Sequence, residues 1–223
     1  MCDIKENILK LREELPAGVQ LVAVSKYHPE EDIEVAYAAG QRIFGENHVQ
    51  ELRRKQPLLP SDIKWHFLGH LQTNKVKYIA PYITVIESID SERLIEEINR
   101  QALRNNRVID ILLELHVAKE ETKSGLTIDE CTQLLESGIK ERYENIRICG
   151  LMTMASNTDD EALIESEFKT ADNYFNYVKS TYFPNDSYFC EKSWGMSGDY
   201  KIAIRQNATL VRIGTMIFGP RVY

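Results

Sequence analysis

Short runs of β-favouring, mostly apolar residues alternate along this chain with segments of helical periodicity. Several of the runs are apolar at nearly every position, as strands are when both of their faces are buried. The eight predicted strands cover residues 20–26, 42–46, 65–69, 84–89, 109–117, 146–153, 188–194 and 209–214. Eight strands that alternate with helices favour a (β/α)8 barrel, and the 223 residues are slightly fewer than the roughly 250 typical of that fold.

Helical periodicity is clearest in the segments 3–15, 29–39, 91–105 and 160–182. The sequence TIDE predicts a capping box, in which Thr127 accepts a backbone N–H and Glu130 reaches back. A doubly wound open sheet also alternates strands with helices, but it usually needs fewer strands, and no G-x-G-x-x-G sequence follows a predicted strand. We therefore expect one barrel domain over residues 1–223, with an extra helix before the first strand.

Charge and cysteine content limit the classes of function. The net charge is −7 without a basic run, which argues against nucleic acid and anionic membranes as partners. No apolar stretch approaches the roughly 18 residues of a membrane span, and the charged N-terminal segment lacks the apolar core of a signal peptide. The four cysteines form no C-x-x-C pair. We expect a reduced, cytoplasmic protein.

The ends of the last two predicted strands suggest a phosphate site. In such barrels the active site lies at the carboxyl ends of the strands, and phosphate often binds between the loops after strands seven and eight. Strand seven leads into GMSGD, where Gly198 permits close backbone approach and Ser197 can cap the next helix. Strand eight ends in RIGT, where Gly214 and Thr215 offer N–H groups and a hydroxyl. Ordinary turn chemistry is the alternative.

Lys26 ends the first strand, LVAVSK, at the mouth of the expected barrel. Desolvation disfavours the ammonium form, and a neutral amine is what Schiff-base formation needs. Together with a phosphate site, this lysine suggests a phosphorylated aldehyde cofactor such as pyridoxal phosphate. The alternative is a lysine that extends into water.

Arg212 in strand eight has two possible roles. It could approach the cofactor ring, where a permanent cation keeps the ring nitrogen unprotonated, or it could form a structural ion pair. In the loop after strand five, Glu120 and Lys123 are either an exposed ion pair or ligand contacts. His66 and His70 lack the H-E-x-x-H context, so packing or capping is expected of them rather than metal binding.

Seven motifs, in order along nearly the whole chain, resemble the YggS/PROSC family, the pyridoxal phosphate homeostasis proteins. They are AVSK (23–26), FGENHVQE (44–51), WHFLGHLQTNK (65–75), KSG (123–125), GLMTM (150–154), GMSGD (195–199) and VRIGTMIFG (211–219). The resemblance implies a barrel similar to the N-terminal domain of alanine racemase. It also implies a non-catalytic protein that binds, stores or delivers pyridoxal 5′-phosphate and keeps the free aldehyde low.

The resemblance further implies the residues of the cofactor site. Lys26 would hold pyridoxal phosphate as the internal aldimine, Arg212 would approach the pyridine nitrogen, and Asn47 would line the pocket. The phosphate would be bound by Ser197, Gly214 and Thr215, assisted by a helix that begins near Gly198. A second contact is implied at Lys123, with Glu120 beside it.

Two residues depart from the family pattern, Trp194 in SWGMS and His116 in LHV, both beside matched positions. Alanine racemase takes a catalytic tyrosine from a second domain, and the sequence ends at Tyr223, shortly after strand eight. Since Lys26 supplies only one of the two bases a racemase needs, we expect a carrier whose partners would be apoenzymes. We expect a monomer, because a barrel with no added domain has no obvious need to dimerise. Two alternatives stay open: a racemase-like enzyme with Tyr27 or Lys123 as second base, and a barrel that binds another phosphorylated metabolite noncovalently.

Overall fold

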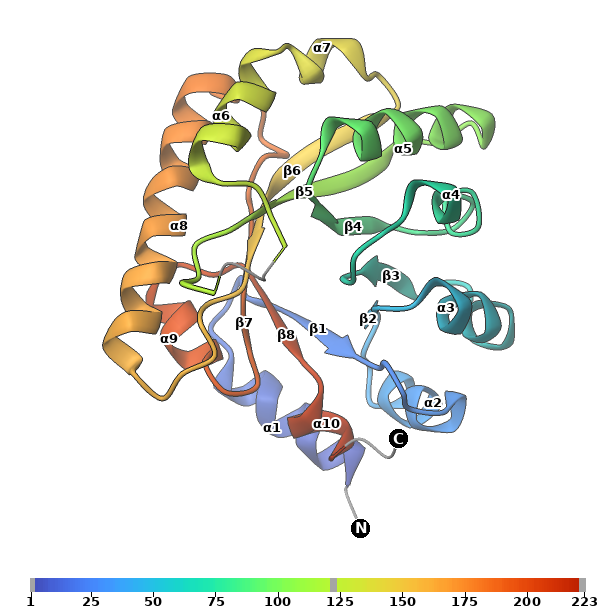
Figure 1. Ribbon diagram of the computed structural model, residues 1–223. Helices are drawn as coiled ribbons and strands as arrows, with labels where there is room; N and C mark the ends of the chain where they lie inside the picture. Colours follow the sequence, from blue (N-terminus) through green and yellow to red (C-terminus); the bar gives the residue numbers. More distant parts are fainter. Residues whose placement is uncertain (1–2, 121–123, 221–223) are drawn as a thin grey trace.

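The computed structural model of the chain describes residues 3–120 and 124–220. Eight parallel strands pair in sequence order, and the last pairs with the first to close a barrel (Figure 1). The strands are β1 (Gln20–Val24), β2 (Ile43–Glu46), β3 (Lys64–Phe67), β4 (Val85–Ile89), β5 (Ile109–Leu115), β6 (Ile146–Thr153), β7 (Glu191–Met196) and β8 (Leu210–Ile213). The predicted (β/α)8 barrel is confirmed.

Helices surround the barrel, and one of them precedes the first strand (Figure 1). They are α1 (Ile4–Glu14), α2 (Glu30–Ala38), α3 (Val49–Lys55), the 3-10 helix η1 (Gln56–Leu58), α4 (Thr73–Val76), α5 (Glu92–Arg104), α6 (Ile128–Glu136), α7 (Ile139–Arg142), α8 (Glu161–Tyr182), α9 (Tyr200–Arg205) and α10 (Thr215–Phe218). The predicted capping box is present, because the Thr127 hydroxyl accepts the Glu130 N–H while the Glu130 carboxylate accepts the Thr127 N–H.

The predicted strand 188–194 begins three residues too early, since β7 runs from Glu191 to Met196. The residues that misled the prediction are aromatic. Phe189 stacks on Phe183 and on Phe175 of α8, with ring centroids 4.3 Å and 4.9 Å away. These side chains therefore pack a loop onto the helix layer and do not extend the strand.

Two apolar cores stabilise the fold, one between the strands and the helices and a smaller one inside the barrel. The inner core is built from Val22, Leu112, Cys149, Met152 and Leu210. Alternate residues of a strand point to opposite faces, so Val22 and Val24 of β1 share the inner face. The predicted first strand, 20–26, is two residues too long at its end, because β1 ends at Val24. Lys26 therefore lies in the turn that follows β1, at the carboxyl end of the strand.

Among residues 3–120 and 124–220, no helix has both the length and the apolar composition that crossing a membrane requires.

Candidate functional site

A cavity of about 240 Å³ opens at the carboxyl ends of the strands. It is lined by seven residues that the sequence predicts as a site: Lys26, Asn47, Ser197, Gly198, Arg212, Gly214 and Thr215. Apolar side chains, among them Leu68, Met152 and Met154, complete its wall. The fold thus brings together residues from the two ends of the sequence at a single small cavity.

Ser197 and Gly198 lie in the turn between β7 and α9. The predicted cap at Ser197 is wrong: α9 begins at Tyr200, and Asp199 is its N-cap residue. The Asp199 carboxylate accepts the Met196 N–H at 2.5 Å, and the Asp199 N–H donates to the Met196 carbonyl at 3.1 Å. This closed turn leaves Ser197 at its tip as part of the cavity wall, where its hydroxyl is available to a ligand.

The two glycines of the site serve different purposes. A Cβ atom on Gly198 would meet no heavy atom within 4 Å, so the backbone there borders open space. A Cβ atom on Gly214 would lie 3.0 Å from the carbonyl oxygen of Val24. Gly214 is therefore required for the close approach of β8 to β1, whereas Gly198 leaves room for a ligand.

Arg212 forms part of the floor of the cavity and is almost completely buried. Its Nη1 donates to the carbonyl and the hydroxyl of Ser193, each at 2.6 Å, and its Nη2 donates to the Thr153 carbonyl at 2.8 Å. The Glu87 carboxylate lies 3.8 Å from Nη1. The predicted ion pair of Arg212 is therefore present, and its position in the cavity lining is compatible with the predicted approach to a cofactor ring.

A buried chain of polar groups continues below Arg212. Glu87 accepts from the Ser193 hydroxyl at 2.6 Å, and its other oxygen lies 2.6 Å from Nδ1 of His66. Burial alone would raise the pKa of Glu87, but the contact with His66 and the charge of Arg212 hold that pKa below its ordinary value. Burial lowers the pKa of Arg212, and the charge of Glu87 opposes this effect.

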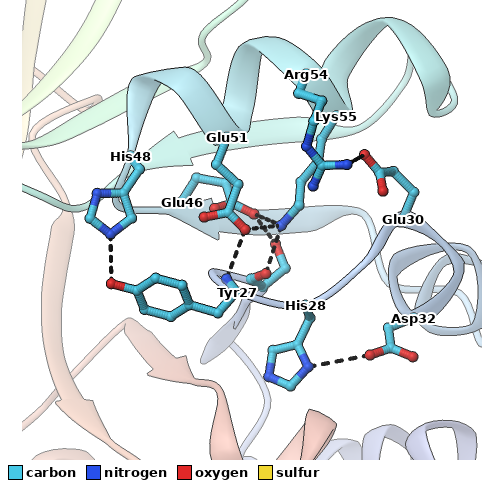
Figure 2. A network of polar contacts seen from close by, with 10 residues as sticks. Tyr27, His28, Glu30, Asp32, Glu46, His48, Glu51, Arg54 and Lys55 are labelled. Atoms are coloured by element: carbon cyan, nitrogen blue, oxygen red, sulfur yellow. Dashed lines mark hydrogen bonds and ion pairs between the residues drawn. The ribbon is translucent and has the colours of Figure 1, made fainter. Parts of the chain in front are cut away.

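A second buried cluster involves Ser25, the residue before Lys26, and Figure 2 shows its members Lys55, Glu46 and Glu51. Lys55, at the end of α3, is completely buried, and its Nζ donates to the Ser25 carbonyl at 2.8 Å, to Glu46 at 2.8 Å and to Glu51 at 2.6 Å. The Ser25 hydroxyl also donates to Glu46, at 2.7 Å. Burial raises the pKa of Glu46 to about 7, although the charge of Lys55 opposes the rise.

Several residues singled out in the sequence lie away from the cavity lining. Glu120 accepts the Asn157 N–H at 2.9 Å and so joins the loops after β5 and β6, while Lys123 lies outside the described residues. The Tyr27 hydroxyl contacts Nε2 of His48 at 2.8 Å (Figure 2). The indole of Trp194 donates to the Gln206 carbonyl, and His116 contacts the Ala118 carbonyl. Neither departure from the family pattern reaches the cavity wall.

Sequence reasoning missed the charged groups that support the site. Glu46 and Glu87 each stand in a mostly apolar, buried strand, IFGE and VIESI, and a carboxylate in a buried strand signals a buried partner. Lys55 carried no such signal, because the end of a helix ordinarily exposes a lysine. Its burial depends on the two acids, which come from β2 and from α3 itself.

The cavity suits a small anionic ligand that also carries a carbonyl group. Hydroxyls of Ser197 and Thr215 can donate to an anion, and Lys26 brings an amine to the same cavity. The Asn47 side-chain oxygen is buried without a hydrogen-bond partner among the described residues, which leaves it for a polar group of a ligand. Within residues 3–120 and 124–220, no cluster of three His, Cys, Asp or Glu side chains could hold a metal ion.

The family model described as alanine racemase, N-terminal domain, matches residues 2–222. Over 224 residues the chain is 36% identical to the pyridoxal phosphate homeostasis protein of Aquifex aeolicus, covering 99% of this chain and 96% of that protein. Among solved structures it is similar to PipY of Synechococcus elongatus PCC7942 with PLP bound, at 35% identity and a TM-score of 0.88. The same protein without PLP gives 36% identity and a TM-score of 0.91, and both matches cover 97% of this chain and 100% of that chain.

Proposed function

The chain belongs to the alanine racemase N-terminal domain family, among the pyridoxal phosphate homeostasis proteins, and on this premise we propose that it binds pyridoxal 5′-phosphate and acts in the homeostasis of that cofactor. The observation that carries the proposal is the single cavity in which Lys26, Ser197, Arg212 and Thr215 meet. An amine, two hydroxyls and a buried cation are the groups that an aldehyde with a phosphate and a ring nitrogen requires.

Each residue has one task in this proposal. When bound, pyridoxal 5′-phosphate would supply an aldehyde, and the residue that holds it must present a neutral amine. Lys26 would supply that amine from the turn that follows β1. Ser197 and Thr215 hold the phosphate, and the backbone at Gly198 borders the same cavity without obstruction. The Asn47 amide lies where it can orient the ligand.

Arg212 decides what chemistry the bound ring can support. A guanidinium remains protonated at physiological pH, so beside the pyridine nitrogen it keeps that nitrogen unprotonated. The ring would then be a weak electron sink. Arg212 cannot move away easily, because Ser193, Thr153 and Glu87 hold its guanidinium.

We propose a carrier rather than a racemase. A racemase needs a base on each face of its substrate. Tyr27, the candidate second base among the described residues, does not line the cavity and has its hydroxyl against His48. The partners of a carrier would be apoenzymes that accept the cofactor from a monomer. A cytoplasmic location is supported by Cys131, Cys149 and Cys190, which are all free thiols.

The test is a binding titration followed by transfer. The purified protein is titrated with pyridoxal 5′-phosphate, pyridoxal and inorganic phosphate, and the loaded protein is then mixed with a pyridoxal-phosphate-dependent apoenzyme. We expect a yellow complex with pyridoxal 5′-phosphate, weaker binding of pyridoxal, and reactivation of the apoenzyme. Steady turnover of free amino acids in D2O, with deuterium incorporated at Cα, would show that the protein is an enzyme and not a carrier. Binding of phosphate without a coloured complex would favour the noncovalent alternative.

A further inference from the structure

Lys55 uses every hydrogen-bond donor it has. A lysine ammonium carries three N–H donors, and the three acceptors within hydrogen-bond distance of Nζ are the Ser25 carbonyl, Glu46 and Glu51. Because Lys55 is completely buried and faces the helix layer, it has no donor left for a ligand in the cavity. A lysine is seldom buried without such partners. Any effect of Lys55 on the cavity must therefore act through the residues that its hydrogen-bond partners contact.

The partners of Lys55 hold the backbone on both sides of Lys26. The Ser25 carbonyl belongs to the peptide group before Lys26, and it accepts from Lys55. The peptide group after Lys26 contributes the Tyr27 N–H, which donates to Glu51 at 2.7 Å. Glu51 is itself bonded to Lys55 (Figure 2). Two peptide planes that share one Cα atom fix the direction of its Cα–Cβ bond.

The segment needs such support because its backbone is unusual. Tyr27 has φ of +68°, in the left-handed region that residues other than glycine rarely adopt. Such a conformation persists when surrounding contacts determine it. Here the contacts come from Glu51, which holds the Tyr27 N–H, and from the His28 N–H, which donates to the Ser25 carbonyl at 3.1 Å.

We propose that Lys55 is a positioning residue for Lys26, holding the peptide groups on either side of it, directly at Ser25 and through Glu51 at Tyr27. This inference rests on the proposed function, since it assigns to Lys55 the alignment of the amine that forms the Schiff base. Loss of the Lys55 amine frees the 25–27 segment to rotate. The Lys26 amine then samples directions away from the aldehyde, while Ser197 and Thr215, which follow β7 and β8, stay in place.

The decisive variant is Lys55→Met, which keeps most of the side-chain length but removes all three donors. The probes are pyridoxal 5′-phosphate and inorganic phosphate. Two readouts are compared: the fraction of bound cofactor that borohydride fixes to Lys26, and the affinity for inorganic phosphate, measured by competition. We expect the fixed fraction after brief reduction to fall about tenfold while phosphate affinity changes less than about twofold. General loss of structure would lower both together.

Two control variants each remove a positively charged side chain that forms an ion pair outside the Lys55 cluster. Arg54→Met changes the neighbouring residue of α3, whose ion pair is with Glu30 (Figure 2). Lys192→Met breaks a mostly buried ion pair with Asp172, whose oxygen lies 2.5 Å from Nζ, so it matches the loss of a buried cation. In both variants, the fraction of bound cofactor that borohydride attaches to Lys26 should equal that of the wild type.

Glu51→Ala provides the test if Lys55→Met does not fold. Glu51 is partly exposed, so its removal opens the Tyr27 N–H to water without stranding a buried charge alone, as Glu46 still pairs with Lys55. We expect a severalfold loss of the fraction fixed to Lys26. If the wild type forms the adduct at Lys26 and both Lys55→Met and Glu51→Ala fix the same fraction of cofactor as the wild type, the role of Lys55 is wrong. The proposed function would still stand. Absence of any adduct in the wild type would overturn the proposed function as well.

Discussion

Nη1 of Arg212 lies 3.8 Å from Oε2 of Glu87, and both side chains are buried inside the barrel beneath the cavity. The Ser193 hydroxyl connects them, accepting from Arg212 and donating to Glu87. The cavity floor is therefore an ion pair with its own hydrogen-bonded support. A cation held in this way presents a fixed charge to whatever ligand lies above it.

Glu87→Gln is expected to destabilise the protein by about 3 kcal/mol at pH 7, because it leaves Arg212 buried without its counter-charge. The folded pKa of Glu87 is depressed, so its contribution to the free energy of unfolding is present above pH 4.5 and lost as pH falls through the folded pKa. Urea denaturation of both proteins at neutral and at acid pH measures this difference. Glu6→Gln, on the exposed face of α1, should change stability by less than about 0.5 kcal/mol. Equal stability of Glu87→Gln and wild type at pH 7 would contradict the account.

Glu46 is expected to give the opposite dependence of the free energy of unfolding on pH. Its pKa rises from 4.5 to about 7 on folding, so the folded protein keeps a proton that the unfolded chain releases. The contribution of Glu46 to the free energy of unfolding falls as pH rises through this window, by about 3 kcal/mol at most. Glu46→Gln removes the titration. The stability of wild type relative to Glu46→Gln should therefore decline between pH 4.5 and pH 7, and parallel profiles would show that Glu46 titrates normally.

The sequence alone predicts the barrel and the cavity wall because both depend on local pattern. The position of Lys26 at the end of LVAVSK predicts that it lies at the barrel mouth, and the glycines of GMSGD and RIGT mark the loops after the last strands. The support behind Lys26 depends on contacts between distant residues, such as Lys55 with Ser25, which no local pattern encodes. The predicted cap at Ser197 is wrong because Ser197 and Asp199 are both good N-cap residues, and only the turn geometry selects Asp199.

Substitution by alanine should have different effects at the two glycines of the site, Gly198 and Gly214. Gly214→Ala places a methyl group 3.0 Å from the Val24 carbonyl, so we expect a loss of stability of about 1–3 kcal/mol. Gly198→Ala meets no protein atom within 4 Å, so stability should change by less than about 0.5 kcal/mol. Its methyl group would instead restrict the cavity and weaken cofactor binding. Thermal unfolding and a binding titration separate the two effects, and an unchanged affinity in a stable Gly198→Ala variant would place the phosphate elsewhere.

The hydroxyls of the site should discriminate between ligands. Removing a hydrogen bond to a charged group costs about 1.5–3 kcal/mol, which corresponds to roughly a tenfold or greater loss of affinity. We expect Ser197→Ala and Thr215→Val to weaken pyridoxal 5′-phosphate by this factor and to leave pyridoxal nearly unchanged, because pyridoxal has no phosphate. Titration of each variant with both ligands measures the ratio of its affinities for pyridoxal 5′-phosphate and for pyridoxal. A parallel loss for both ligands would mean that these hydroxyls do not contact the phosphate.

The most direct test of the account is to identify the residue that carries the cofactor. The protein is incubated with pyridoxal 5′-phosphate, reduced with borohydride, digested and analysed by peptide mass spectrometry, with Lys26→Ala as the control. We predict a yellow protein, a single reduced pyridoxyl adduct on the peptide that contains Lys26, and no such adduct in the variant. An adduct on another lysine, or a colourless protein without an adduct, would contradict the assignment of Lys26 and of the cavity at the barrel mouth.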